Sequence, residues 1–526
     1  MNDSVLTIIW IVSFVLVTVA VTGFSRRIGW SAPIALVAVG AIVSFIPGVP
    51  QVVIEPDLIL YGLLPPLLFA AAIRTSFVDV RARGDSIFTL SVGLVAFTVV
   101  AVGFFTWLLV PAITLATGFA FAAVVAPTDA VAITAISGRL RLPRRLVTIL
   151  EGESLFNDAT ALVALAAAIT AIVGTLNPLA VAGDFVLAVV VGVAFGFTVG
   201  YALTAIRKLL HAPVLDTSLS LVTPFIAFIP TQLLHGSGVL AVVIAGLIVG
   251  QSAPVVQSAR ARIAETLNWR TIRFLLENSV FLFIGLNLAG ILRGVTQSGL
   301  GLWQTILICV VTLLFLTFAR FVWVAMLTVI YRFGPRRLRA RSWTWNNAIA
   351  ISFAGLRGVV TLAAVFLLPP VPQRPFLQFL AFVVVVGTLL QGLALPWVIR
   401  RLRLPPPNGD QELVEAQMLM AEAKAAGVVQ LDIEISEADN AAVVDRLRAD
   451  AALLGESLSD QGPEDSEPAQ AAFGRLRLAM ILAERQAVLA ARADGRYQEP
   501  AVRAILAAID AEEIAIRTLA PRSGDD

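Results

Sequence analysis

Three acidic side chains interrupt a run of residues, 150–163, that is otherwise apolar enough to cross a membrane. The acids are Glu151, Glu153 and Asp158. Ionisable groups at membrane depth are costly, so they usually mark an ion path or a proton relay. Ser154 and Asp158 are four residues apart and share a helix face, with Asn157 beside them. A hydroxyl, an amide and a carboxylate offer oxygen ligands for a hard cation. We therefore expect this segment to handle cations rather than covalent chemistry.

Charged side chains are scarce within the apolar segments, so their balance is informative. The acids that we place at membrane depth outnumber the bases. The acids are Asp129, Glu151, Glu153, Asp158 and Glu277, and the bases are Arg320 and Arg357. A buried carboxylate without a counter-charge takes up a proton or a cation, because the bare charge is unfavourable in a low dielectric. The surplus of acids predicts a site that holds protons or metal cations.

Two apolar segments carry residues that interrupt a helix. Pro127, which precedes Thr128 and Asp129, cannot donate its amide, and its ring clashes with the carbonyl four residues back. Gly355 and Gly358 give a later segment a second flexible point. Broken helices are tolerated at membrane depth where they line a cavity, and their free carbonyl groups can ligate Na⁺. Two such interruptions predict an inverted-repeat transporter.

The elements that position these residues belong to a membrane protein. Of the 526 residues, 58% are hydrophobic and only 14% are charged, whereas soluble domains carry about 25% charged residues. We expect an all-α polytopic membrane protein with about thirteen transmembrane helices. The predicted spans are 5–24, 32–47, 58–73, 87–110, 113–137, 146–173, 180–206, 216–233, 236–251, 272–292, 302–331, 345–368 and 376–400.

Basic residues in the loops indicate how the chain crosses the membrane. Loops after the odd-numbered spans hold groups of Arg and Lys, whereas loops after the even-numbered spans offer only Arg293 and Arg374. Basic loops tend to remain in the cytoplasm. We therefore expect the N-terminus outside and the C-terminus in the cytoplasm. Because the basic residues lie in these short loops, the net charge of +2 gives no reason to expect nucleic acid as a partner.

A change of composition after Pro405 predicts a second domain. Residues 1–403 form the predicted transmembrane domain, and residues 404–526 form a predicted cytoplasmic domain rich in Ala, Glu and Arg. The second domain shows helical periodicity near residues 409–427, 436–456, 467–494 and 498–519. It shows no glycine-rich nucleotide motif and no cluster of metal ligands. We expect an amphipathic helical tail that packs on itself, on a second subunit or on the membrane domain.

Four short motifs resemble the bacterial sodium/proton antiporters of the NhaP and animal exchanger type. They are Glu153-Ser154-Leu155-Phe156-Asn157-Asp158, Pro127-Thr128-Asp129, Ser237-Gly238-Val239-Leu240-Ala241 and Gly355-Leu356-Arg357-Gly358. The resemblance covers the whole predicted membrane region. It implies a NhaA/NhaP-like fold in a bacterial inner membrane. It also implies a homodimer, in which a mobile core domain moves against a dimerisation domain by alternating access.

The resemblance also implies roles for individual residues. Asp158 would be the main carrier of cation and proton, and Asp129, Ser154 and the Thr128 carbonyl would complete the site. Asn157 would orient the broken fifth span. An Asn-Asp pair, rather than Asp-Asp, is associated in this family with electroneutral one-for-one exchange.

The other buried charges would be structural or gating residues. Glu153 would pair with Arg320 in the eleventh predicted span. Arg357 matches an arginine of the family's twelfth span, and we expect Glu277 to be its partner. One departure concerns the third span, where many relatives carry an acid after a Leu-Pro-Pro-Leu-Leu-Phe run. Here Ala70 follows that run, so the choice among Na⁺, Li⁺ and K⁺ stays open.

These inferences predict a secondary antiporter that exchanges Na⁺, with Li⁺ or K⁺ as alternatives, for H⁺. A proton and a cation would compete for Asp158 and Asp129, and either would neutralise the site so that the core can reorient. The expected partners are monovalent cations, protons, membrane lipid and a second copy of the chain. The ions are cargo, and we expect no cofactor and no enzymatic reaction.

Other functional classes fit the sequence less well. A K⁺-selective exchanger or a cation channel with a regulatory cytoplasmic tail is the main alternative. A signalling receptor would need an output domain, and residues 405–526 show none. An intramembrane hydrolase would need a nucleophile motif, and neither a motif nor a second catalytic acid accompanies Ser237 and His235.

Overall fold

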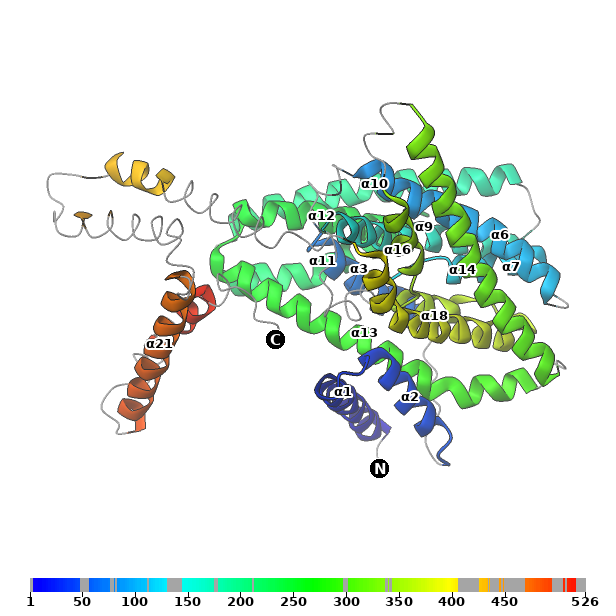
Figure 1. The fold of residues 1–526 in the computed structure, drawn as a ribbon, viewed down its shortest axis with the longest axis horizontal. Coiled ribbons are helices and arrows are strands. Elements are labelled where there is room, and N and C mark those ends of the chain that lie inside the picture. Colours follow the sequence, from blue (N-terminus) through cyan, green and yellow to red (C-terminus); the bar gives the residue numbers. More distant parts are fainter. Residues whose placement is uncertain are drawn as a thin grey trace. The chain divides into compact units, whose positions relative to one another are not determined.

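The computed structural model is helical in the part of the chain that it describes (Figure 1). The described residues are 3–47, 56–75, 80, 83–110, 113–129, 144–174, 178–210, 212–296, 301–335, 339, 343–404, 425–433, 435, 444–445, 448, 469–493, 505–506 and 509–516. The chain divides into two compact units, Met1–Pro405 and Pro406–Asp526.

Long apolar helices make up most of the first unit. Among the described residues, nine are long and apolar enough to cross a membrane. Eight of them are α1 (Asp3–Arg27), α9 (Arg144–Val173), α10 (Pro178–Leu209), α11 (Pro213–Leu233), α12 (Gly238–Val256), α13 (Ala259–Thr296), α14 (Leu302–Phe333) and α18 (Arg374–Leu402). The ninth joins α5 (Gly84–Phe88), η2 (Thr89–Gly93) and α6 (Leu94–Leu109). These helices confirm the predicted polytopic, all-helical class, whereas the count of thirteen spans stays a prediction.

Shorter elements complete the unit and include the interrupted ones. The shorter apolar helices are α2 (Ala32–Ser44), η1 (Leu58–Leu63) with α3 (Leu64–Ala72), and α7 (Leu115–Val125). A second group is α16 (Trp345–Phe353), α17 (Val359–Ala364) and η3 (Val365–Leu367). Helix α7 ends two residues before Pro127, as the missing amide of proline predicts. The remainder of the predicted fifth span, from residue 130, lies outside the described residues.

Small residues allow several helices to approach closely. A Cβ atom added to Gly40 on α2 would lie 2.9 Å from the Cα of Gly285 on α13. On α10, a Cβ atom at Gly196 would lie 2.9 Å from the carbonyl oxygen of Ala241 on α12. Small residues at helix interfaces are a common means of packing within membranes, where apolar burial alone gives little driving force.

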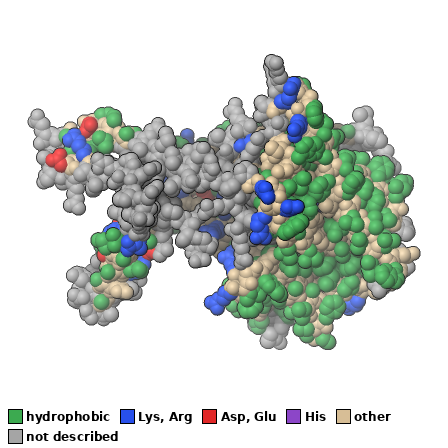
Figure 2. Space-filling view, viewed as in Figure 1, with side chains coloured by type: hydrophobic (Ala, Val, Ile, Leu, Met, Phe, Trp, Pro, Cys, Tyr) green, Lys and Arg blue, Asp and Glu red, His purple; other side chains and the backbone are tan. Residues whose placement is uncertain are grey.

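The outer surface of the first unit matches a lipid environment. On the face shown in Figure 2, hydrophobic side chains cover most of this unit, and Lys and Arg gather along one edge. Large apolar side chains such as Leu16, Trp303 and Leu314 are more than half exposed. Exposed apolar area on this scale marks a membrane or protein interface.

The second unit contains α21 (Ala469–Ala493), which corresponds to a helix expected near residues 467–494. Ion pairs join α21 to residues 509–516: Arg477 contacts Glu512, and Arg485 contacts Asp510 and Glu513. Most of the helices expected at 409–427 and 436–456 lie outside the described residues.

Candidate functional site

Helix α9 carries the polar residues of the sixth predicted span. It runs without interruption from Arg144 to Val173, so residues three and four apart lie on one face. Glu153 and Asn157 are buried, each with 1% of its surface exposed. Ser154 and Asp158 are partly exposed because they line a cavity.

A chain of hydrogen bonds connects α9 to the segment that follows α7. Glu153 and Arg320 form a buried ion pair between α9 and α14, with Nη1 to Oε1 at 2.5 Å and Nη2 to Oε2 at 3.0 Å. The Thr128 hydroxyl donates to Glu153 Oε1 at 2.8 Å. Asn157 Nδ2 donates to the Thr128 hydroxyl at 2.8 Å and to its carbonyl at 3.2 Å. The structure thus contains the Glu153–Arg320 pair, and Asn157 contacts the broken span as expected.

The two interrupted segments meet each other. The backbone amide of Asp129 donates to the carbonyl of Leu356 at 2.8 Å. An arginine side chain also donates hydrogen bonds to a backbone carbonyl at the end of the helix that precedes each segment. Arg357 Nη1 donates to the carbonyl of Ala126 at 2.5 Å, and Arg320 donates to the carbonyl of Ile351 through Nε at 3.1 Å and Nη2 at 2.9 Å. Arginine side chains therefore bind carbonyl groups that helices α7 and α16 leave without helical partners.

Two glycines make this crossing possible. A Cβ atom on Gly358 would collide with the carboxylate of Asp129. A Cβ atom on Gly355 would lie 2.5 Å from Cδ and 2.7 Å from Nε of Arg320. Any side chain at either position would displace a charged residue of the site. The sequence indicated flexibility at these glycines, but the structure shows that close approach is what requires them.

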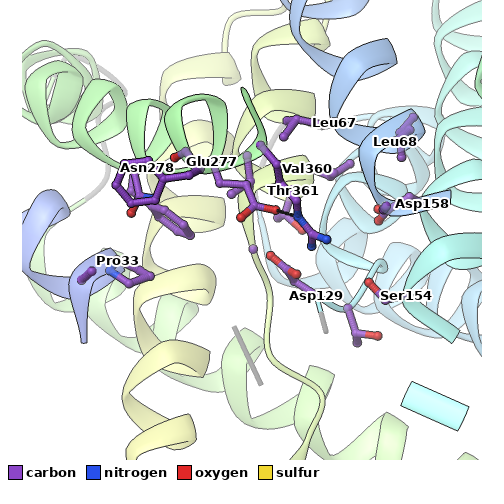
Figure 3. Close-up of a pocket in the computed structure, with 18 of the residues that line it drawn as sticks. Pro33, Leu67, Leu68, Asp129, Ser154, Asp158, Glu277, Asn278, Val360 and Thr361 are labelled. Carbon is purple, nitrogen blue, oxygen red and sulfur yellow. Dashed lines mark hydrogen bonds and ion pairs between the residues drawn. The ribbon is translucent and has the colours of Figure 1, made fainter. Parts of the chain in front are cut away.

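A cavity of about 700 Å³ brings the candidate ligands together. Thr128, Asp129, Ser154 and Asp158 all line it. Figure 3 shows Asp129, Ser154 and Asp158 in one part of the cavity, with Pro33 and Asn278 farther away. The sequence placed these four polar residues in one site, and the cavity contains all four.

Glu277 does not pair with Arg357, and this expectation was wrong. Glu277 lines the cavity, but its carboxylate accepts from Arg273 Nε at 2.6 Å, one turn earlier on α13. Arg357 instead binds the Ala126 carbonyl. The reason is geometric: Arg273 shares a helix face with Glu277, while the break in the fifth span supplies Arg357 with a backbone acceptor.

Four basic residues also line the cavity. They are Arg26, Arg74, Arg270 and Arg273. Burial and the nearby charges of Arg273 and Arg270 lower the pKa of the Arg74 guanidinium, and Glu151 and Glu277 oppose this shift. The acids at this end of the cavity thus offset part of the positive charge that an entering cation would meet.

The donor set at Asp129 and Asp158 consists of oxygen atoms. The carboxylates, the Ser154 hydroxyl and the Thr128 carbonyl suit a hard cation, and the carboxylates can also hold a proton. Among the described residues, no group of three or more His, Cys, Asp or Glu side chains could hold a metal ion. Oxygen donors of this kind suit hard cations, whereas thiolate and imidazole ligands suit transition metals.

Comparison with known proteins assigns the family. A family model described as "sodium/hydrogen exchanger, transmembrane" matches residues 12–401. The chain belongs to the sodium/hydrogen exchanger family. A Mycobacterium tuberculosis protein, named an uncharacterized Na⁺/H⁺ exchanger, is 30% identical over 96% of this chain and 95% of its own length. The sodium, potassium, lithium and rubidium/H⁺ antiporter of Bacillus subtilis is 30% identical over 73% of this chain and 60% of its own length.

A solved exchanger structure shares the fold. The sodium/proton antiporter MjNhaP1 from Methanocaldococcus jannaschii matches with a TM-score of 0.60 and 16% sequence identity. The match covers 76% of this exchanger chain and 99% of that chain. At this identity the likeness concerns the fold, and it agrees with the NhaP-like architecture that the motifs imply.

A second buried charge cluster in this exchanger was missed at the sequence level. Arg207 contacts Asp216 at 3.0 Å and Glu265 at 2.6 Å, where α10, α11 and α13 meet. Gln257 Nε2 donates to both carboxylates, and Ser220 donates to Glu265. The predicted spans leave Glu265 in a loop, because the ninth ends at 251 and the tenth begins at 272. The absence of proline from 259 to 296 was a signal that the helix continues.

Proposed function

We propose that this protein is a secondary antiporter that exchanges Na⁺, Li⁺ or K⁺ for H⁺ across a bacterial cytoplasmic membrane. The observation that carries the proposal is the pair of carboxylates, Asp129 and Asp158, beside the crossing of two interrupted helices in one cavity. Asp158 is the principal carrier, and Asp129, Ser154 and the Thr128 carbonyl complete the cation site. Membership of the exchanger family supports cation/proton antiport in general.

Competition for one site is sufficient to couple the two ions. Asp158 binds either a proton or a cation, because each neutralises the same carboxylate. The loaded site can move through a low dielectric, whereas the empty, charged site is held back by the cost of transferring charge. No separate coupling device is needed. The chain has the Asn157-Asp158 pair that the family associates with electroneutral exchange, so the proposed exchange is one-for-one.

The surrounding charges support an inward-open conformation. The cavity that reaches Asp158 is also lined by Arg26, Arg74, Arg270 and Arg273, which belong to or adjoin loops that the positive-inside rule assigns to the cytoplasm. With the same orientation we propose thirteen spans in inverted repeats, an outer N-terminus, a cytoplasmic tail and a homodimer that moves by alternating access.

The identity of the cation is the least constrained part of the proposal. The third span has Ala70, which is fully buried, where many relatives carry an acid. The Bacillus subtilis relative is named for sodium, potassium, lithium and rubidium, which keeps several alkali cations among the candidates. A K⁺-selective exchanger is therefore a variant of the same proposal.

Proteoliposomes with an imposed pH gradient test the proposed function. Na⁺, Li⁺ and K⁺ are added separately, and collapse of the gradient is followed with a pH-sensitive dye. We expect a cation-dependent collapse that is lost in Asp158→Asn and kept in Asp184→Asn, which removes an exposed acid on α10. Collapse that requires a membrane potential would favour a channel. No response from folded protein to any of the three ions would refute antiport.

A further inference from the structure

Thr361 on α17 presents a buried hydroxyl to the candidate cation site. Its side chain lines the same cavity as Asp129, Ser154 and Asp158 (Figure 3). Only 1% of the residue is exposed, and Oγ1 has no hydrogen-bond partner among the described residues. A buried hydroxyl without a partner is unfavourable, and at a cavity wall a bound ion can supply the missing partner.

The lack of a partner has a structural cause. Several other buried threonines donate to the carbonyl four residues earlier, as Thr106 does to Val102 and Thr231 to Ala227, each at 2.7 Å. For Thr361, the residue four positions earlier is Arg357, which lies in the interrupted segment before α17 begins at Val359. The break in the helix therefore removes the usual acceptor and leaves the hydroxyl available.

The contact at Gly358 places the start of α17 beside Asp129. Gly358 packs against the Asp129 carboxylate so closely that a Cβ atom would collide with it. Thr361 follows three residues later, so it lies on the same face of the chain as it enters α17. The hydrogen bond from the Asp129 amide to the Leu356 carbonyl fixes this arrangement at 2.8 Å.

Helix α3 also lines the cavity, but it offers no side-chain oxygen there. Helix α3 contributes Leu67, Leu68 and Ala71 there, and none of these side chains carries an oxygen atom. Ala70 is buried and does not line the cavity. An oxygen ligand is thus absent from the α3 wall and present on α17.

We propose that the Thr361 hydroxyl is a further ligand of the transported cation. The assignment rests on the proposed antiport function and adds a ligand to the site formed by Asp129, Asp158, Ser154 and the Thr128 carbonyl. A neutral hydroxyl can coordinate an alkali cation but does not take the proton that the carboxylates compete for. Thr361 therefore strengthens cation binding without strengthening proton binding, and it sets the cation concentration at which exchange is half-maximal.

Paired substitutions in the intact protein test this assignment. Thr361→Val removes the hydroxyl but keeps a branched side chain, and Thr361→Ala removes both. Thr361→Ser keeps the hydroxyl. Thr312→Val is the matched control, because Thr312 also has a buried hydroxyl without a partner but does not line the cavity. The readout is the half-saturating Na⁺, Li⁺ and K⁺ concentration in proteoliposomes, together with the maximal rate, for protein that elutes as a single folded species.

We expect the two hydroxyl-free variants to need about tenfold more cation for half-maximal exchange, as the loss of one polar contact implies. Their maximal rate should stay close to that of the wild type, and Thr361→Ser and Thr312→Val should bind as the wild type does. If the wild type is active and the half-saturating cation concentration is unchanged in both hydroxyl-free variants, the assignment of Thr361 is overturned and the proposed antiport function stands. A wild type without cation-dependent exchange would instead overturn the proposed function and the assignment with it.

Discussion

Asn157 donates from one amide group to both the hydroxyl and the carbonyl of Thr128, at 2.8 and 3.2 Å. Thr128 in turn donates to Glu153, which is paired with Arg320. One buried network therefore connects α9, the segment after α7, and α14. The position of Asp129, the residue after Thr128, depends on this network rather than on a continuous helix.

Replacing Asn157 with Ala should loosen the segment that carries Asp129. Two buried acceptors on Thr128 would lose a donor, which we expect to cost about 1–3 kcal/mol of unfolding free energy. Exchange should fall because Asp129 is no longer held beside Asp158. Thermal unfolding and exchange assays check this, with Asn287→Ala as control, because Asn287 donates to the Phe283 carbonyl of its own helix. Equal effects of the two substitutions would contradict the role of Asn157.

Removing one partner of the Glu153–Arg320 pair should be more harmful than removing both. Arg320→Met leaves Glu153 buried without its counter-charge, which typically costs about 3–5 kcal/mol. The double variant Glu153→Gln/Arg320→Met should recover part of that stability, although the Ile351 carbonyl still loses its donor. A double-mutant cycle on the purified protein measures the coupling. Strictly additive effects would show that the two residues do not stabilise each other.

The contact between Gly358 and Asp129 should make alanine intolerable at position 358. The added methyl group would collide with the Asp129 carboxylate, and overpacking of this kind costs about 1–3 kcal/mol. We expect exchange by Gly358→Ala to drop by about tenfold or more. Gly183→Ala on α10 serves as control, because no atom lies within 4 Å of the position that its Cβ atom would take. Wild-type exchange by Gly358→Ala would refute this packing.

The second unit contains a pH-dependent contact. Arg477 donates to both oxygens of Glu512, at 2.7 and 2.8 Å, and these bonds lower the pKa of Glu512 from its ordinary value of 4.5. A lowered pKa means that the contact is at full strength above pH 4.5 and is lost as the pH falls through the lowered value.

Hydrogen exchange of the full-length protein checks this contact. Protection of residues 509–516, relative to Arg477→Gln, should be greatest at neutral pH and disappear in acid. The difference is expected to be small, because Glu512 is largely exposed and solvent screens such pairs. A difference that grows as the pH falls would contradict the sign of the effect.

The polar residues of the site could be predicted because their chemistry is local. Proline disfavours a continuous helix, and α7 ends two residues before Pro127, although α11 continues through Pro224 and Pro230. The spacing of Ser154, Asn157 and Asp158 fixes their relative positions on any helix. The sequence therefore predicts which of these side chains share a helix face without knowledge of the rest of the fold, and their roles in ion binding stay predictions.

Partners that depend on broken backbone could not be predicted in the same way. The prediction paired Arg357 with Glu277 because both are charged. Arg357 instead binds the Ala126 carbonyl, and a list of charged side chains does not include backbone acceptors. The free hydroxyl of Thr361 follows only from the residue at which α17 begins. The cluster of Arg207 with Glu265 depends on the full length of α13, and the ends of elements are the least certain part of a sequence-based prediction.

The most direct test of the central claim is the dependence of the half-saturating cation concentration on pH. If a proton and a cation compete for Asp158, this concentration should rise as the pH falls, while the maximal rate at saturating cation stays the same. The measurement uses proteoliposomes of the wild type with the cation that proves to be transported. A maximal rate that falls with pH at a constant half-saturating concentration would show that protons act elsewhere, and would contradict exchange through one shared site.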